Sequence, residues 1–217
     1  MGWKTLGEGW ECRPDGHWVH TGRLLLRPLT AKDVDALPAV FDEEVVRWQG
    51  YCREPVALRE MAYRWAQAAG RPQPQGQLRY DWAICDRGSG ELVGARSMVV
   101  YRSKRHGLAY DTGSNLKAGW RDKGYGAEEL RAVLQLSQVH LGYGTAYAGT
   151  DPANHRAIHV YEKCGFRVYG KRPGWVLPNG TNVEAVVMRH RQPAHRSCRT
   201  ALREPWLRVL GFRARDR

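Results

Sequence analysis

Residues 121–127, which read RDKGYGA, combine glycines with basic side chains. Glycine lets the backbone approach a ligand closely because it has no side chain. The segment lies before a predicted helix, and the first N–H groups of a helix have no partners within the helix. Such helix ends bind phosphate, and each favourable contact with an anion contributes about 0.3–1 kcal/mol at a surface. With Arg121 and Lys123 beside these groups, the segment predicts a phosphate or pyrophosphate site. An ordinary glycine-rich turn is the alternative.

A second segment, residues 151–166 (DPANHRAIHVYEKCGF), places an amide and a phenol on one side of a predicted helix. Tyr161 follows Asn154 by two helical turns, so the two side chains share a face. One helix can therefore contact a ligand at its start and present a phenol deeper in a cleft. Helix capping, shared with Asp151, is the alternative role for Asn154. Packing in the core is the alternative role for Tyr161.

Apolar periodicity and turn residues predict the elements that hold these two segments. Strands are expected over residues 23–29, 80–85, 91–101, 108–116, 145–150, 167–170 and 182–190. Helices are expected from Ala31 after a Thr30 cap, in short pieces over 41–48, and over 55–69, 126–141 and 151–164. Three consecutive hairpin strands among alternating helices and strands indicate an α/β (α+β) fold. We expect an N-terminal extension over 1–22, one domain over 23–190 and a basic tail over 191–217.

The two segments, in this order and about 30 residues apart, resemble the GCN5-related N-acetyltransferase (GNAT) family. Residues 121–127 are similar to its Arg/Gln-x-x-Gly-x-Gly/Ala pyrophosphate loop. Residues 154–166 are similar to its Asn-x-x-Ala/Ser-x-x-x-Tyr-x-Lys-x-Gly-Phe segment. Residues 21–28, TGRLLLRP, resemble the first strand of the branch that includes the ribosomal-protein N-terminal acetyltransferases. The resemblance spans residues 21–190.

The resemblance implies a mixed, mostly antiparallel central sheet, splayed at a bulged strand and covered by helices on both faces. It also implies acetyl-CoA as the co-substrate and an amine that attacks the thioester directly in a ternary complex. Direct attack makes a nucleophilic cysteine unnecessary. The oxyanion that forms needs a hydrogen-bond donor, which a free N–H of the splayed strand can supply.

The same resemblance assigns the residues that would bind the cofactor. The pantetheine arm would insert beside strand 109–116, bulged near Ser114 and Asn115. Backbone groups for it would come from Asn115, Leu116 and Ala118. The pyrophosphate would be held by Arg121, Asp122, Lys123, Gly124, Tyr125, Gly126 and Ala127, and the pantetheine or adenosine would lie beside Asn154 and Arg156. Asp122 stands where this branch more often has glycine, so its side chain should point away from the pyrophosphate.

Tyr161 matches the family tyrosine that donates to the leaving sulfur. A phenol of pKa about 10 protonates the thiolate of a thiol of pKa about 8.5 only at a cost of about 2 kcal/mol. We therefore expect Tyr161 to act first as a hydrogen-bond donor. Asp111 is the first candidate for a base, because it lies two residues before Gly113, where this branch often has glutamate. Glu184 and Asp81 are alternatives, and a plain surface acid is an equally good interpretation of Asp111.

Trp48, Tyr51 and Glu184 are predicted to contact the acceptor. Trp48 and Tyr51 fall where family members place their acceptor-site helices, and core packing is the equal alternative. We expect a primary amine of a small molecule as the acceptor. A protein N-terminus, as in the ribosomal-protein acetyltransferases, is one alternative. A non-catalytic module that binds acyl-CoA or nucleic acid is the other.

Composition narrows the class of protein. The chain has 217 residues, of which 42% are hydrophobic and 26% charged, as in an ordinary globular domain. No apolar run approaches the roughly 20 residues of a membrane span, and no apolar signal core follows the start, so we expect a cytoplasmic location. Scattered cysteines without a C-x-x-C pair predict reduced thiols and no metal site. His155 and His159 have metal-like spacing but no evident third ligand.

The formal net charge of +12 is concentrated at the C-terminus, where residues 189–217 hold nine arginines against Glu204 and Asp216. Such a positive charge attracts any polyanion, including coenzyme A, so the charge alone does not identify the ligand. We do not expect a nucleic-acid partner. In the tail, one helical stripe is formed by Leu202, Trp206, Val209 and Leu210. Packing of this stripe on the domain, or on a second subunit of a homodimer, is favoured over binding to an acidic partner or a membrane surface.

Overall fold

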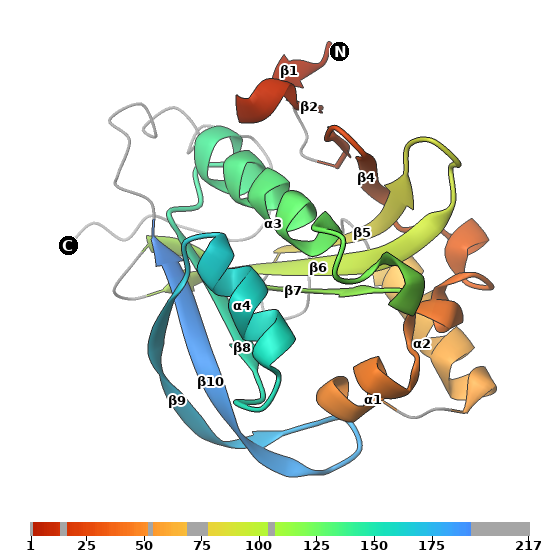
Figure 1. The fold of residues 1–217 in the computed structure, drawn as a ribbon, viewed down its shortest axis with the longest axis vertical. Helices are drawn as coiled ribbons and strands as arrows, with labels where there is room; N and C mark the ends of the chain where they lie inside the picture. The colour runs from red at the N-terminus through yellow and green to blue at the C-terminus, as the bar shows by residue number, and fades with distance from the viewer. Residues whose placement is uncertain (1, 14–16, 52–53, 69–77, 104–106, 192–217) are drawn as a thin grey trace.

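The computed structural model describes residues 2–13, 17–51, 54–68, 78–103 and 107–191. The basic tail and its predicted helical stripe lie outside the described residues. Within them, one sheet has the strand order β1-β2-β3-β4-β5-β6-β7-β8-β10-β9 (Figure 1). Its strands are β1 (Lys4–Thr5), β2 (Glu11–Cys12), β3 (Val19–His20), β4 (Leu24–Pro28), β5 (Leu78–Asp86), β6 (Leu92–Ser103), β7 (Gly107–Leu116), β8 (Thr145–Thr150), β9 (Arg167–Val176) and β10 (Asn182–Arg191).

Neighbouring strands pair antiparallel, except for β7 and β8, which are parallel. The mixed, mostly antiparallel sheet that the resemblance implies is therefore confirmed. Residues 2–20, which gave no clear pattern in the sequence, add the three short strands at one edge. Val19 of β3 pairs with Leu26 of β4, so this segment continues the same sheet.

The helices of the described residues are α1 (Glu43–Gln49), α2 (Pro55–Ala68), α3 (Tyr125–Gln135) and α4 (His155–Lys163). A π-helical turn over Leu136–His140 continues α3, so the two together cover the helix predicted over 126–141. The helix predicted from Ala31 is only a 3₁₀ turn over Ala31–Asp33. The Asp33 carboxylate accepts hydrogen bonds from the Thr30 N–H (2.8 Å) and from Arg27 (2.8 and 2.6 Å), which closes the turn on itself.

Helices cover both faces of the sheet, and β5 shows this most clearly. Tyr80, Trp82 and Ile84 belong to the hydrophobic core shared with α3 and α4. Ala83 and Cys85 belong to a second core shared with α1 and α2. Because neighbouring residues of a strand face opposite sides, a strand segment buried on both faces should be apolar throughout, as β5 is from Trp82 to Cys85. Figure 1 shows α3 and α4 lying across the sheet.

The sheet opens between β7 and β8. The parallel pairing joins only Ala109–Asp111 to Thr145–Tyr147, although β7 continues to Leu116 and β8 to Thr150. The expected bulge near Ser114 and Asn115 is wrong, because β6 and β7 keep a continuous register from Gly107 to Leu116. The opening arises because β8 turns away from β7, which leaves backbone groups of β7 after Asp111 without a neighbouring strand on that side.

A bulge does occur in the β9–β10 hairpin. Trp175 pairs with Val183 and Arg172 with Ala185, so Pro173 and Gly174 together oppose the single residue Glu184. Gly174 has φ +67°, which favours glycine, and proline lacks the N–H that a regular ladder requires. The bulge lets β9 run to Val176, six residues beyond its predicted end at residue 170.

Candidate active site

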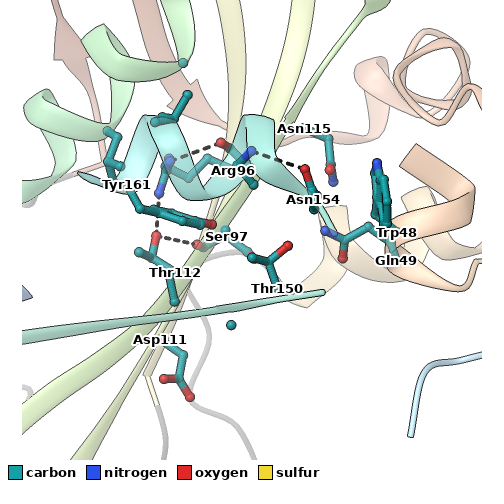
Figure 2. A pocket seen from close by; sticks show the side chains of 18 of the residues that line it. Trp48, Gln49, Arg96, Ser97, Asp111, Thr112, Asn115, Thr150, Asn154 and Tyr161 are labelled. Atoms are coloured by element: carbon teal, nitrogen blue, oxygen red, sulfur yellow. Dashed lines mark hydrogen bonds between the residues drawn. The ribbon is translucent and has the colours of Figure 1, made fainter. Parts of the chain in front are cut away.

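A cavity of about 450 Å³ lies at the opening between β7 and β8. It is lined by residues of α1, β6, β7, β8, α3, α4, β9 and β10. Arg96, which faces α3, and Ser97, its neighbour on β6, both line it (Figure 2). Since neighbouring residues of a strand project to opposite faces, the cavity passes through the sheet.

Two ends of the cavity are distinguished below. The loop end is lined by Arg121, Gly126, Asn154 and Arg156, at the starts of α3 and α4. The strand end is lined by Asp111, Tyr147 and Arg172, from β7, β8 and β9. In Figure 2, Asp111 lies well apart from Asn115 and Asn154.

At the loop end, the backbone of residues 121–127 adopts the conformation that its glycines predict. Gly124 precedes α3 with φ +82°, a left-handed value that costs other residues energy. Asp122 also has a positive φ, of 60°, and asparagine and aspartate tolerate this region better than most side chains. Gly126 lines the cavity, and a Cβ there would first meet Val160 at 3.8 Å. The first turn of α3 thus faces the cavity without side chains in the way.

The arginines of the loop end are held by acids of the same chain. Arg121 contacts Asp42 (2.8 Å) and Glu44 (3.0 Å), which begin α1. Arg156 contacts the other oxygen of Glu44 (2.5 Å) and also Asp122 (3.1 Å). Carboxylate oxygens therefore occupy the positions on both guanidinium groups where phosphate oxygens would bind.

Asn154 is the N-cap of α4, where its side-chain oxygen accepts the Ala157 N–H at 3.1 Å. The prediction that the helix starts at Asp151 is wrong. The Asp151 carboxylate instead accepts the Ala153 N–H at 2.7 Å in a turn before the helix. Since Asn154 also lines the cavity, capping and a position at the ligand site coexist in this residue.

Tyr161 lines the cavity from α4, with only 9% of its surface exposed. Its ring packs 5.3 Å from that of Phe166. Burial raises the pKa of the Tyr161 phenol, and the nearby positive charge of Arg96 opposes this rise. The phenol therefore stays protonated at neutral pH and is able to donate a hydrogen bond.

Beside Tyr161 lies a buried polar network that the sequence did not predict. Arg96 of β6 (2% exposed) pairs with Glu129 of α3 (0% exposed), and its guanidinium also donates to the hydroxyls of Thr112 and Ser114. Ser114 in turn donates to Glu129 at 2.6 Å. The network fixes α3 to β6 and β7 at the point where the sheet opens. Its one sequence signal was an arginine within an otherwise apolar strand.

At the strand end, Asp111 accepts a hydrogen bond from the Tyr101 hydroxyl at 3.3 Å. Solvent reaches the Asp111 side chain at the cavity mouth. Desolvation by the surrounding protein nevertheless raises the pKa of its carboxyl, whereas the Tyr101 hydrogen bond and the positive charge of Arg172 lower that pKa. A raised pKa makes this carboxylate a better proton acceptor than a free aspartate.

Several predicted site residues do not line the cavity. Tyr51 packs edge-on against Phe41 (5.3 Å between ring centroids) and near Trp65 (6.0 Å). Glu184 is exposed and pairs with Lys171 at 2.8 Å. The other predicted residues that do not line the cavity are Ala118, Asp122, Lys123, Gly124, Tyr125 and Ala127. Trp48, Asn115 and Leu116 do line it, together with the residues named above.

The alternative base Asp81 is also accounted for. Its carboxylate is buried and held by Arg79 through two contacts, at 2.6 and 2.8 Å.

The described residues contain no group of three or more histidine, cysteine, aspartate or glutamate side chains that could hold a metal ion. None of their helices is long and apolar enough to cross a membrane.

Comparison with known proteins decides the family. Residues 23–167 match the model of the acetyltransferase (GNAT) domain. The chain belongs to the GNAT family. It is an acyl-CoA-dependent N-acetyltransferase, and GNAT acetyltransferases use acetyl-CoA as the acyl donor.

Three known proteins show how close the likeness is. An uncharacterised N-acetyltransferase of Bacillus subtilis, YoaA, is 27% identical over 177 residues, or 78% of this chain and 96% of that protein. The L-amino acid N-acetyltransferase AaaT of Escherichia coli is 26% identical over 99 residues, or 46% of this chain and 61% of AaaT. The structure of the ribosomal-protein-S5-alanine acetyltransferase of Vibrio fischeri superposes with a TM-score of 0.64 at 14% identity, over 81% of this chain and 99% of that one. The last likeness concerns the fold alone.

The residues present fit acetyl-CoA. The free N–H groups at the start of α3 and the guanidinium groups of Arg121 and Arg156 suit a pyrophosphate. The opening after Asp111 offers backbone groups to an extended arm, and the Tyr161 phenol lies in the same cavity.

Proposed function

We propose that this GNAT enzyme transfers the acetyl group of acetyl-CoA to the primary amine of a small molecule, by direct attack in a ternary complex. The observation that carries the proposal is the cavity, which joins the start of α3, the Tyr161 phenol and the Asp111 carboxylate. Its volume of about 450 Å³ falls within the range of roughly 300–1,000 Å³ that is usual for small-molecule sites.

In the proposed reaction, the neutral amine nitrogen forms a bond to the thioester carbon. The carbon–sulfur bond then breaks, and the sulfur leaves as the thiolate of coenzyme A. An N–H of β7 on the side without a neighbouring strand stabilises the oxyanion. Tyr161 donates a hydrogen bond to the leaving sulfur. The amine proton passes to Asp111, directly or through water, and a proton from solvent converts the thiolate into a thiol.

The demand on Asp111 depends on the amine. An α-amino group of pKa about 8 is about one-tenth neutral at pH 7, whereas a lysine-like amine of pKa about 10.4 is neutral only about once in 2,500 molecules. A single half-solvated carboxylate is sufficient for the first kind of amine. The identity of AaaT as an L-amino acid acetyltransferase supports a small acceptor.

The test is release of free thiol from acetyl-CoA with a panel of amines, which includes amino acids, polyamines, aminoglycosides and peptides with free N-termini. We expect turnover of a small amine, and Tyr161→Phe should lower kcat about 100-fold by removing the donor to the sulfur. The matched control is Tyr63→Phe on α2, which removes an exposed hydroxyl away from the cavity.

Turnover confined to peptides would reject the small-molecule acceptor in favour of a protein N-terminus. Tight binding of coenzyme A without thiol release from any amine would reject the enzymatic role and favour a binding module. Unchanged kcat in Tyr161→Phe would remove the phenol from the mechanism.

A further inference from the structure

The charges that line the cavity are divided unequally between its two ends. The charged side chains concerned are Glu44, Arg96, Asp111, Arg121, Arg156 and Arg172. Arg96 is paired with Glu129, and the loop-end arginines are paired with acids of α1 and with Asp122. Only Asp111 and Arg172 are left without an ion-pair partner among the described residues.

Asp111 and Arg172 face the same space but do not form an ion pair with each other. Among the described residues, the Asp111 carboxylate accepts a hydrogen bond from the neutral Tyr101 hydroxyl alone, at 3.3 Å. The Arg172 guanidinium has no hydrogen bond within the described part of the chain, yet it lies near enough to act on the charge of Asp111. One negative and one positive group thus line the same end of the cavity without pairing to each other.

The β9 bulge directs Arg172 into the cavity. Residues three apart on a regular strand face opposite sides of the sheet. Arg172 and Trp175 nevertheless both line the cavity, as do Ala185 and Val187 of β10. The extra residue at Pro173 and Gly174 shifts the alternation by one position and brings both side chains to the cavity side.

We propose that the acceptor is an amino carboxylate, whose carboxylate binds the Arg172 guanidinium while its amine faces Asp111. The assignment rests on the proposed function and names the class of acceptor. A guanidinium binds a carboxylate through two parallel hydrogen bonds, and a carboxylate attracts an ammonium group. A zwitterion placed head to tail satisfies both charges. A phosphate dianion in its place would leave surplus negative charge beside Asp111.

The order of events follows from this placement. The acceptor binds as a zwitterion, with its ammonium group hydrogen-bonded toward Asp111. A proton moves from the ammonium to the Asp111 carboxylate and on to solvent, and the neutral amine that remains attacks the thioester carbon. The second proton of the nitrogen then passes to the freed Asp111 carboxylate as the carbon–sulfur bond breaks and the thiolate leaves. Arg172 stays bound to the acceptor carboxylate throughout, so it acts in binding and takes no part in the bond changes.

The test compares α-, β- and γ-amino carboxylates with their primary amides as acceptors in the thiol-release assay. The amine of an amide is less basic, so more of it is neutral at pH 7, and any preference for the acid must come from recognition of the carboxylate. We expect kcat/KM to be about 10- to 100-fold higher for the best acid than for its amide. Arg172→Gln should abolish this preference by raising KM for the acid. Arg64→Gln, at an exposed position of α2 outside the cavity lining, is the matched control and should retain the preference.

Equal rates for acid and amide, or a preference that persists in Arg172→Gln, would overturn the inference and leave the acetyltransferase function intact. Faster turnover of an aminophosphonate than of the matching carboxylate would overturn the choice of anion. If no amine releases thiol, the proposed function fails, and calorimetric binding of acid and amide to the protein saturated with coenzyme A decides the Arg172 contact independently. In that measurement, acid binding must exceed amide binding and must weaken in Arg172→Gln.

Discussion

The loop end and the strand end of the cavity differ in whether their charged side chains are paired. At the loop end, Arg121 and Arg156 are already neutralised by Asp42, Glu44 and Asp122. At the strand end, Asp111 and Arg172 line the same cavity and have no ion-pair partner among the described residues. A pyrophosphate that binds the loop-end arginines would therefore replace internal acids, and its binding would be an exchange of partners. An acceptor at the strand end would meet charges that no described side chain neutralises, so its own charges would decide whether it binds.

The buried network around Arg96 joins α3 to β6 and β7 beside the opening of the sheet. Arg96→Met leaves the Glu129 carboxylate buried without an ion-pair partner, which should lower the free energy of unfolding by about 3–5 kcal/mol. Urea denaturation measures this loss. The matched double variant Arg96→Met/Glu129→Leu removes both charges and should recover most of the stability. A loss below about 1 kcal/mol in the single variant would mean that the two ends do not depend on this pair.

At the strand end, Asp111→Asn should lower kcat/KM about 10-fold at neutral pH, because the amine loses its attraction and its proton acceptor. The raised pKa of Asp111 places its loss of charge at higher pH than in a free aspartate. Wild-type activity should therefore fall as the pH drops through that raised pKa, and this limb should vanish in Asp111→Asn.

A carboxyl whose pKa is raised in the folded state costs stability at every pH above that pKa. Asp111→Asn should consequently not lower the melting temperature at neutral pH, which separates its effect on activity from unfolding. Glu184→Gln, which alters an exposed acid outside the cavity, is the control. If that variant shows the larger loss of activity, Glu184 is the base and the strand end has been assigned to the wrong acid.

The smallest effect is expected at the loop end. Glu44→Gln removes the carboxylate that bridges Arg121 and Arg156, so coenzyme A no longer displaces it and should bind about 3-fold more tightly. Calorimetry at low salt measures the dissociation constant. Glu43→Gln, one residue earlier in α1 and outside the cavity lining, should change it less. Weaker binding in Glu44→Gln would show that Glu44 orders the two arginines and does not compete with the ligand.

The sequence predicted the loop end far better than the strand end. Gly124 has a positive φ that favours glycine, and Gly126 follows it in the same short motif, so local sequence predicts both. The pair of Arg96 and Glu129 joins residues that only tertiary packing brings together. Pro173 and Gly174 indicate a loop, because proline and glycine both weaken a regular strand. Nothing nearby in the sequence shows that a bulge opposite Glu184 accommodates them within β9.

The same argument applies to the elements of the fold. Strongly alternating or apolar strands such as β5 and β6 were predicted to within a few residues, since their pattern follows from burial on two faces. The expected splay of β7 from a neighbouring strand is present, but the bulge expected near Ser114 and Asn115 is not. The sheet opens where β8 diverges, and that divergence depends on how β8 pairs with β10 and leaves no mark on β7 itself.

The bulge in β9 makes substrate choice sensitive to how the β9–β10 hairpin pairs as well as to the identity of the cavity residues. If β9 paired regularly with β10 over the same number of residues, Arg172 and Trp175 would lie three positions apart on an unbulged strand, and one of these two side chains would turn to the opposite side of the sheet. Deletion of Pro173 or Gly174 would instead place them two positions apart and keep both on the cavity side. Substitutions of Pro173 and Gly174 therefore bear on specificity although neither residue lines the cavity.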